Sequence, residues 1–159
     1  MDRDAIIELM SDPVAQELVK APIHARLAYS AQDGSPRVIP IGYMWNGEVF
    51  VMGSPVNAPK VKALAANPKV ALTVDTDSFP AHVLLVRGEA AVEVGAGVPD
   101  EFVEASRRFV GRHARMGGQR TGTVQADGDH PCDPTWVKVF DFATRLPGPV
   151  EELMKENVG

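Results

Sequence analysis

The segment Ser54–Leu64 (SPVNAPKVKAL) holds the most informative group of residues for chemistry in the chain. It places a turn and the start of a helix directly after an apolar run, and free N–H groups at a helix start attract anions. Lys60 falls in the first helical turn, where the helix dipole disfavours a cation by about 0.3–1 kcal/mol. A bound phosphate would reverse that sign, and the Ser54 hydroxyl would add a donor. The segment is therefore a candidate phosphate site, although on spacing alone a solvated surface lysine is the commoner explanation.

Further candidates lie in the preceding run, PRVIPIGYMW. Arg37 could bind a phosphate in bidentate fashion, or it could be an exposed residue beside a hairpin turn. Gly42 would let a flat ligand approach the backbone, and a β-bulge explains it equally well. Tyr43 and Trp45 could stack on an aromatic ring, although core aromatics are the commoner explanation.

The histidines and the cysteine give little indication of a metal or a nucleophile. His130 and Cys132 lie close together, but zinc requires about four ligands, and His113 is the one further histidine of the same loop. We therefore predict no metal site. The single cysteine excludes a disulfide framework, and the sequence has neither a nucleophile elbow nor a phosphate-loop lysine motif. No side chain is assigned a catalytic role.

The composition is that of one globular domain over residues 1–159, with 45% hydrophobic and 23% charged residues. Sixteen Lys and Arg against 21 Asp and Glu give a net charge of −5, which disfavours a nucleic-acid or anionic-membrane partner. No run approaches the roughly 20 apolar residues of a membrane span. The N-terminus has no signal-peptide pattern, so we expect a cytoplasmic protein.

Two turn signals, Asp33-Gly34 and Asn46-Gly47, separate β-rich runs and predict an antiparallel meander. Pro40 inside the second run predicts that this strand lies at an edge or a bulge. The expected strands are Ala25–Ala31, Pro36–Trp45, Glu48–Gly53, Lys69–Asp75, His82–Val94 and Thr135–Phe142. About six antiparallel strands with small peripheral helices predict a mainly β fold, and a barrel best removes exposed edges.

Helices are expected around this sheet. Residues 1–22 form a helical prologue, in which Asp12 caps a second helix and Pro13 takes its first position. Another helix is predicted from Ala58 to Ala66, with Asn57 as its N-cap. Two more are predicted at 99–109 and 149–159. The Gly111–Pro134 segment, rich in Gly, Arg, Asp and His, is predicted to be a long loop.

The run from Ala25 to Val94 resembles the flavin-binding split-barrel proteins related to pyridoxamine 5′-phosphate oxidase, with weaker similarity as far as Pro147. The resemblance rests on the order of several short elements. They are a strand after Asp33-Gly34 with Pro40 inside it, a strand ending in Gly53-Ser54, Lys60 opening a short helix, an Asn67-Pro68 stop, and a strand containing Arg87-Gly88-Glu89-Ala90.

This resemblance implies a split barrel that forms a homodimer with FMN at the subunit interface. It implies an FMN-dependent oxidoreductase that transfers hydride through flavin N5 to or from an unidentified small molecule. The implied cofactor-binding residues are Arg37 and Lys60 at the phosphate, Ser54, Ala58 and Pro59 beside them, and Pro40, Ile41, Gly42 and Met52 along the isoalloxazine ring.

Other functions stay open alongside this one. A barrel of this kind could bind flavin, deazaflavin or haem without turnover, or serve only as a dimeric scaffold. The tail carries only Arg145-Leu146 of the basic C-terminal pattern with which the oxidase grips its substrate phosphate. We therefore do not expect oxidation of pyridoxamine phosphate itself.

Overall fold

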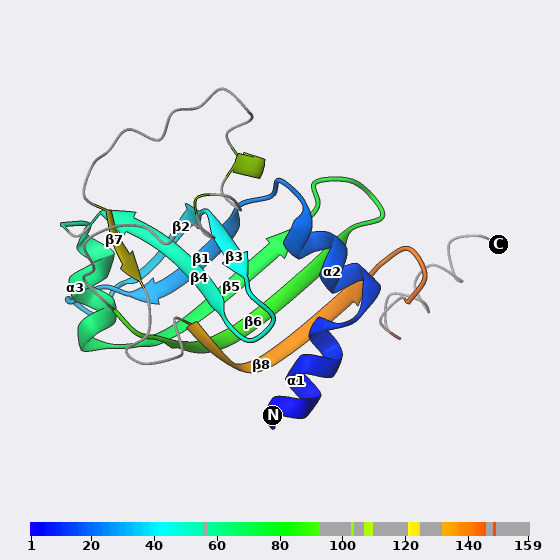
Figure 1. Cartoon of the computed structure of the whole chain (residues 1–159), viewed down its shortest axis with the longest axis horizontal. Coiled ribbons are helices and arrows are strands. Elements are labelled where there is room, and N and C mark those ends of the chain that lie inside the picture. Colours follow the sequence, from blue (N-terminus) through cyan, green and yellow to red (C-terminus); the bar gives the residue numbers. More distant parts are fainter. Residues whose placement is uncertain are drawn as a thin grey trace.

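The computed structural model describes residues 1–55, 57–92, 103, 107–109, 121–124, 132–145 and 148. The helices are α1 (Arg3–Met10), α2 (Pro13–Lys20) and α3 (Pro59–Ala66). The strands are β1 (Ala25–Ser30), β2 (Pro36–Ile41), β3 (Tyr43–Trp45), β4 (Phe50–Pro55), β5 (Lys69–Asp75), β6 (His82–Ala90), β7 (Thr121–Val124) and β8 (Cys132–Asp141). They form a five-stranded sheet, β2-β1-β5-β6-β8, and a three-stranded sheet, β3-β4-β7, in which every pairing is antiparallel (Figure 1).

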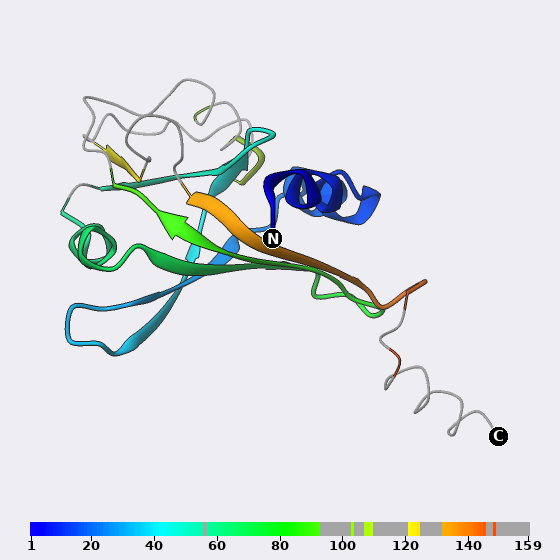
Figure 2. The ribbon, with the colours of Figure 1, turned by 90° about the horizontal axis from the view of Figure 1, so that it is seen from below.

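The two sheets form a split barrel, which confirms the predicted mainly β fold class. The three-stranded sheet lies over one end of the five-stranded sheet, and α1 and α2 cover the other end of the same face (Figure 2). The core lies between these layers. Its largest fully buried side chains include Leu18 of α2, Leu27 of β1, Tyr43 of β3, Leu72 of β5 and Leu84 of β6.

The break at Gly42 corrects the prediction of one strand over Pro36–Trp45. β2 ends at Ile41 in the five-stranded sheet, and β3 begins at Tyr43 in the three-stranded sheet. The run therefore forms two strands, one in each sheet. Its alternation of residue types is the same as that of one continuous strand, so the sequence pattern does not reveal the break. β2 is an edge strand, so the predicted edge position of Pro40 is confirmed, since proline has no N–H to donate to a further neighbour.

The prediction of one long loop over Gly111–Pro134 is wrong for part of that segment. Its residues 121–124 form β7, and β8 already begins at Cys132, so the described residues hold eight strands instead of about six. β7 pairs with β4 on the side opposite β3. Such pairing is made by backbone hydrogen bonds and needs no apolar pattern, so the sequence does not reveal this strand. The predicted helices at 99–109 and 149–159 lie mostly outside the described residues, although residues 107–109 are helical.

The helical prologue forms as predicted. Asp2 accepts a hydrogen bond from the backbone N–H of Ala5 at 2.9 Å, and Asp12 accepts one from that of Val14 at 2.8 Å. These bonds satisfy donors that the first turn of each helix leaves free. Pro13 follows Asp12 at the first position of α2. No helix among the described residues has the length and hydropathy to cross a membrane.

Residues alternate across β6 between the core and water. Leu84, Val86 and Ala90 are buried, whereas Arg87 and Glu89 are exposed. The strand ends at Ala90 and not at Val94, and residues 93–94 lie outside the described part. The exposed side chains lie on the outer face of the five-stranded sheet, the face turned away from α1, α2 and the three-stranded sheet.

Candidate functional site

Arg37 lies on the edge strand β2, opposite Tyr29 of β1. Its guanidinium Nη2 is 3.9 Å from the Asp33 carboxylate, and both side chains are more than half exposed. Hydrogen bonds from Ser35 lower the pKa of Asp33, so this carboxylate is charged at neutral pH. Water and salt screen an exposed pair of this kind, so it contributes little to stability. The guanidinium can therefore turn to an anionic ligand at little cost.

A hollow of about 460 Å³ opens between the β1–β2 hairpin and the start of α3. It brings Arg37 and Pro59, two of the predicted phosphate residues, to one place. It is lined by Tyr29, Ala31, Gln32, Asp33, Arg37, Asn57, Pro59, Lys62 and Ala63. Two cations and one carboxylate among these residues make it a candidate site for an anionic group.

The start of α3 differs from the prediction by one residue. Ala58, and not Asn57, is the N-cap, and no side chain caps this helix. Its first turn thus lacks the side-chain acceptor that Asp2 and Asp12 provide for the other two described helices. Asn57 lies one residue too early to cap and instead lines the hollow. Ala58 and Pro59 therefore stand at the helix start, where the prediction places backbone contacts to a phosphate.

Lys60 is half-buried and is not among the residues that line the hollow. Burial lowers the pKa of its ammonium group. Within the part of the chain that the structure describes, no carboxylate lies within 4.0 Å of that group. A desolvated cation without a counter-charge is costly, so a bound anion would stabilise Lys60. The structure does not bring Lys60 and Arg37 together in one described cavity.

The side chains of three predicted cofactor residues are buried. Ile41 is 6% exposed, Met52 is fully buried, and both belong to the main core. Ser54 is 2% exposed, and its hydroxyl donates to the carbonyl of Pro55 at 3.3 Å. In this arrangement Ile41 and Met52 could border a bound ring only through their backbone, whereas Pro40 is exposed on the edge strand.

Gly42 faces the ring of Phe109. A Cβ atom built on Gly42 would lie 3.6 Å from Phe109 Cδ2, which is an ordinary van der Waals distance. The same ring lies 4.6 Å from that of His24, centroid to centroid. Phe109 thus packs on the point where the chain passes from one sheet to the other.

Tyr43 is a core aromatic, the second of the two interpretations given above. Its side chain is fully buried, burial raises its pKa to about 12, and its hydroxyl donates to the carbonyl of Leu18 at 3.1 Å. Trp45 is partly buried, and its ring lies 4.8 Å from that of Phe50. Neither ring is free to serve as an open stacking platform.

Arg108 makes internal contacts beside Gly42 and Tyr43 that the sequence analysis did not predict. Its guanidinium donates to the carbonyls of Val19, at the end of α2, and of Tyr43, at the start of β3. It lies over the rings of Tyr43 and Phe109, at 4.9 and 4.6 Å. Burial lowers its pKa. Sequence spacing does not predict these hydrogen bonds, because Arg108 is 65 residues or more from both carbonyls.

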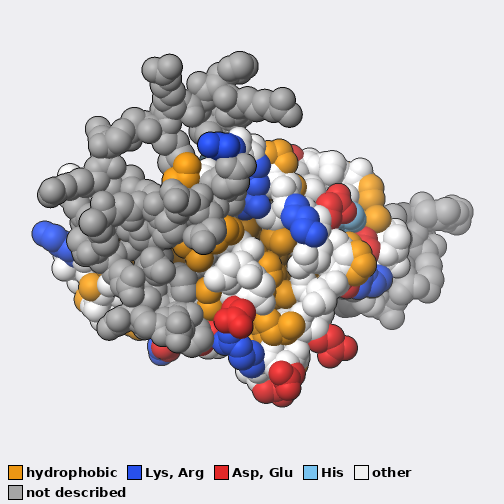
Figure 3. Space-filling view, in the orientation of Figure 1, with side chains coloured by type: hydrophobic (Ala, Val, Ile, Leu, Met, Phe, Trp, Pro, Cys, Tyr) orange, Lys and Arg blue, Asp and Glu red, His pale blue; other side chains and the backbone are white. Residues whose placement is uncertain are grey.

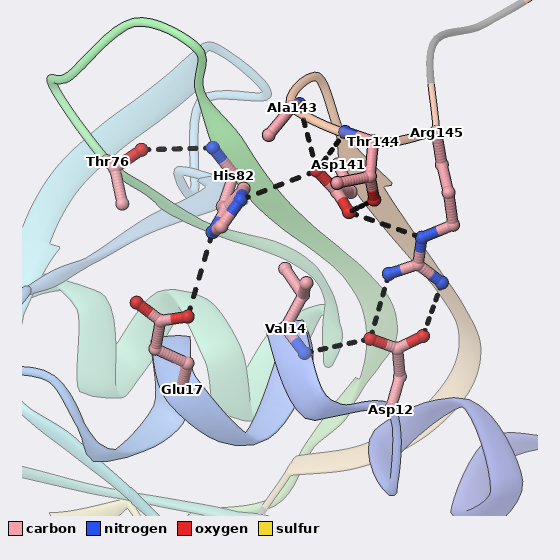
Figure 4. Close-up of polar contacts among 9 residues, drawn as sticks. All are labelled: Asp12, Val14, Glu17, Thr76, His82, Asp141, Ala143, Thr144 and Arg145. Carbon is pink, nitrogen blue, oxygen red and sulfur yellow. Dashed lines mark hydrogen bonds and ion pairs between the residues drawn. The ribbon is translucent and has the colours of Figure 1, made fainter.

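Arg145, the residue that matches the basic tail of the oxidase, is held by carboxylates (Figure 4). It donates to both oxygens of Asp12, at 2.6 and 3.0 Å, and lies 3.4 Å from Asp141. Asp141 also accepts from the backbone N–H groups of Ala143 and Thr144. Arg145 thus joins the turn after β8 to the start of α2, so it is not available to grip a substrate phosphate in this arrangement.

A second hollow, of about 480 Å³, lies on the outer face of the five-stranded sheet and shares Tyr29 and Arg37 with the first. Its floor is formed by small and apolar residues, and Lys69, Arg87 and Glu89 stand around it. The face shown in Figure 3 also carries charged side chains of both signs between hydrophobic ones. Among the described residues, no group of three His, Cys, Asp or Glu side chains could hold a metal ion.

Comparisons with known proteins agree with this architecture. The sequence profile of the pyridoxamine 5′-phosphate oxidase family matches residues 11–135. An F420 reductase structure has a TM-score of 0.61 at 24% identity, covering 77% of this chain and 94% of its own. A conserved hypothetical protein from Mycobacterium tuberculosis has a TM-score of 0.57 at 15% identity, covering 94% of each chain.

General Stress Protein 26 from Bacillus anthracis also has a TM-score of 0.57, at 11% identity, covering 86% of this chain and 94% of its own. A search among curated proteins gives no match. Similarities at these identities establish the fold alone. The family profile, in contrast, spans most of the chain, including β1 to β6 and the start of β8. The chain therefore belongs to the pyridoxamine 5′-phosphate oxidase family.

Proposed function

We propose that this protein is an FMN-dependent oxidoreductase that transfers hydride to or from a small molecule. The observation that carries the proposal is the hollow between the β1–β2 hairpin and α3, where Arg37 and Pro59 meet. A phosphate there would have a guanidinium on one side and a helix start without a side-chain cap on the other. The family membership supports a flavin over other phosphorylated molecules.

We assign the residues of this region to the phosphoryl end of FMN, although Lys60 does not line the hollow and the Ser54 hydroxyl already donates to the carbonyl of Pro55. Arg37 and Lys60 would pair with its charge, while Ala58 and Pro59 would contribute backbone and Ser54 its hydroxyl. Pro40, Ile41, Gly42 and Met52 would lie along the ring. When bound, the flavin would supply the hydride chemistry at its N5 position. The chain's own residues would bind and orient it and exclude water from one face, and none of them is assigned a proton transfer.

We further propose that two copies of the chain pair through the outer face of the five-stranded sheet. Val38 on β2 is 66% exposed there, and it lies opposite Ala28 on β1. Leu85 of β6 and Trp136 of β8 are only partly buried on the same face. The exposed charged side chains of Arg87 and Glu89 lie among these apolar ones, and such a mixture of apolar and polar residues is usual at protein–protein interfaces. We also propose that the substrate is a small molecule and that the protein acts in the cytoplasm.

A deazaflavin is the second candidate cofactor. It is favoured by the similarity to the F420 reductase structure, and the cationic residues Lys69 and Arg87 near Arg37 would suit a longer anionic tail. A flavin-binding protein without turnover is the alternative to an enzyme, because flavin binding alone needs no residue beyond the same site.

The experiment is to purify the protein and record its visible spectrum, then release any chromophore by denaturation and identify it by mass. FMN with an absorbance that bleaches on addition of NAD(P)H and recovers with an electron acceptor would support the oxidoreductase. A flavin that NAD(P)H never reduces would favour the binding protein. A colourless protein that binds neither added FMN nor a deazaflavin would refute the proposal.

A further inference from the structure

Lys62 lines the hollow beside α3, although neither the sequence pattern nor the family resemblance assigned it a role. An α-helix turns by about 100° per residue, so Pro59, Lys62 and Ala63 share one side of α3, and all three line the hollow. Lys60 stands about 160° around the helix from Lys62 by the same arithmetic. The side chains of Lys60 and Lys62 therefore lie on opposite sides of α3.

The charges around the hollow favour an anion. Arg37 approaches from the hairpin and Lys62 from the helix, so two cations from separate elements converge on one space. Asp33 is the one carboxylate among the lining residues, and it already lies 3.9 Å from Arg37. Lys62 has no ion pair with any residue that the structure describes. The space thus holds more positive than negative charge.

We propose that Lys62, together with Arg37, binds the phosphoryl group of the cofactor in this hollow, and that the Asn57 amide adds a donor. The inference rests on the proposed flavin function and adds a binding residue to it. Lys60, on the opposite flank, would approach the same group from outside the hollow. The ligand class is a phosphate monoester or diester, because two cations and an amide donor match its oxygens.

The test compares FMN with riboflavin, which has the same ring but no phosphate. Both are titrated by flavin fluorescence into the wild type, Lys62→Ala, Lys62→Arg and Lys20→Ala. Lys20 is an exposed lysine at the end of α2, so its variant controls for the loss of one positive charge. A charge-assisted contact to phosphate predicts that Lys62→Ala binds FMN about 10- to 100-fold more weakly. Its riboflavin affinity should match that of the wild type, and Lys62→Arg should retain most of the FMN affinity.

The outcomes separate this inference from the proposed function. If the wild type binds FMN and Lys62→Ala binds it no more weakly than Lys20→Ala does, the role of Lys62 is overturned while the flavin proposal stands. Equal losses for FMN and riboflavin would also overturn it, because they would indicate a damaged fold and not a lost phosphate contact. If the wild type binds neither flavin, both proposals fail together.

Discussion

Lys60 is a half-buried cation at the start of a helix, so a ligand that contacts its ammonium group should carry negative charge. Replacing it with alanine removes the charge and leaves the helix intact, since alanine is an excellent helix former. If Lys60 pairs with the cofactor phosphate, Lys60→Ala should weaken FMN binding about 10-fold or more. Flavin retention after gel filtration, compared with Lys20→Ala, measures this. Equal retention in the two variants would place the phosphate elsewhere.

Lys60 also predicts a pH dependence. Burial lowers its pKa, so its ammonium loses a proton at a lower pH than an exposed lysine does. FMN affinity should therefore be highest while Lys60 is charged and should fall as the pH rises through that lowered pKa. Arginine keeps its charge over this range, so Lys60→Arg should bind FMN with a flatter alkaline profile. Titrations from neutral to alkaline pH in both proteins would test the difference.

Among the glycines whose surroundings the structure describes, Gly88 has the least room for a side chain. A Cβ atom there would lie 2.3 Å from the backbone oxygen of Asp133, at the register shift between β6 and β8. Gly88→Ala should lower the free energy of unfolding by about 1–3 kcal/mol, the usual cost of overpacking. Urea denaturation gives the value. Glu89→Ala, at the next and exposed position, is the control and should have little effect.

The sequence predicted only some of these residues, and the reason is geometric. Arg37 and Pro59 were predicted as phosphate residues, and they do line one hollow. Lys62 was missed, because the flank of α3 that faces the β1–β2 hairpin depends on how the helix packs. Arg108 was missed for a similar reason, since its carbonyl partners are far away in the sequence.

The prologue is an element whose attachment depends on charge. Arg145 joins Asp12 at the start of α2 to Asp141 at the end of β8. The bond to Arg145 lowers the pKa of Asp12, and hydrogen bonds led by that of Thr144 lower the pKa of Asp141. A lowered carboxyl pKa stabilises the folded state above the ordinary value of 3.8, and this contribution disappears as the pH falls through the folded-state pKa.

Thermal unfolding should therefore occur at progressively lower temperatures as the pH falls below about 4. Arg145→Ala should reduce this acid sensitivity, because Asp12 loses the partner that lowers its pKa most. Lys20→Ala, which removes an exposed cation that has no ion pair with any described residue, is the comparison. Parallel pH profiles for the wild type and Arg145→Ala would contradict the prediction.

Caps, turn residues and prolines predicted those helix and strand boundaries that depend only on neighbouring residues. Asp12 and Pro13 mark the start of α2 because a cap and a fixed φ act within one turn. The break at Gly42 and the strand β7 were missed, since both depend on which sheet edge is available for pairing. The strand β6 begins at His82 as predicted, but it ends at Ala90 and not at Val94.

At the scale of the whole molecule, the outer face of the five-stranded sheet predicts the oligomeric state. Val38→Lys would place a charge within the proposed contact between two copies, on the edge strand β2, where it would be desolvated without a partner. Sedimentation should then give a dimer for the wild type and a monomer for the variant. Lys20→Ala, on α2 away from this face, should sediment like the wild type. A wild-type monomer would refute the proposed pairing.

The chain passes from one sheet to the other within a single residue, Gly42, with Phe109 packed against it. A connection of one residue cannot accommodate an insertion without moving a strand. An added residue there would shift the register of either β2 or β3 and turn its inward side chains outward. The turn at Gly34, where the chain has room and a positive φ, can absorb extra residues. The turn at Gly47 also has a positive φ and open space. Natural variants of this protein should therefore differ in length at these hairpin tips and keep a constant spacing from Arg37 to Trp45.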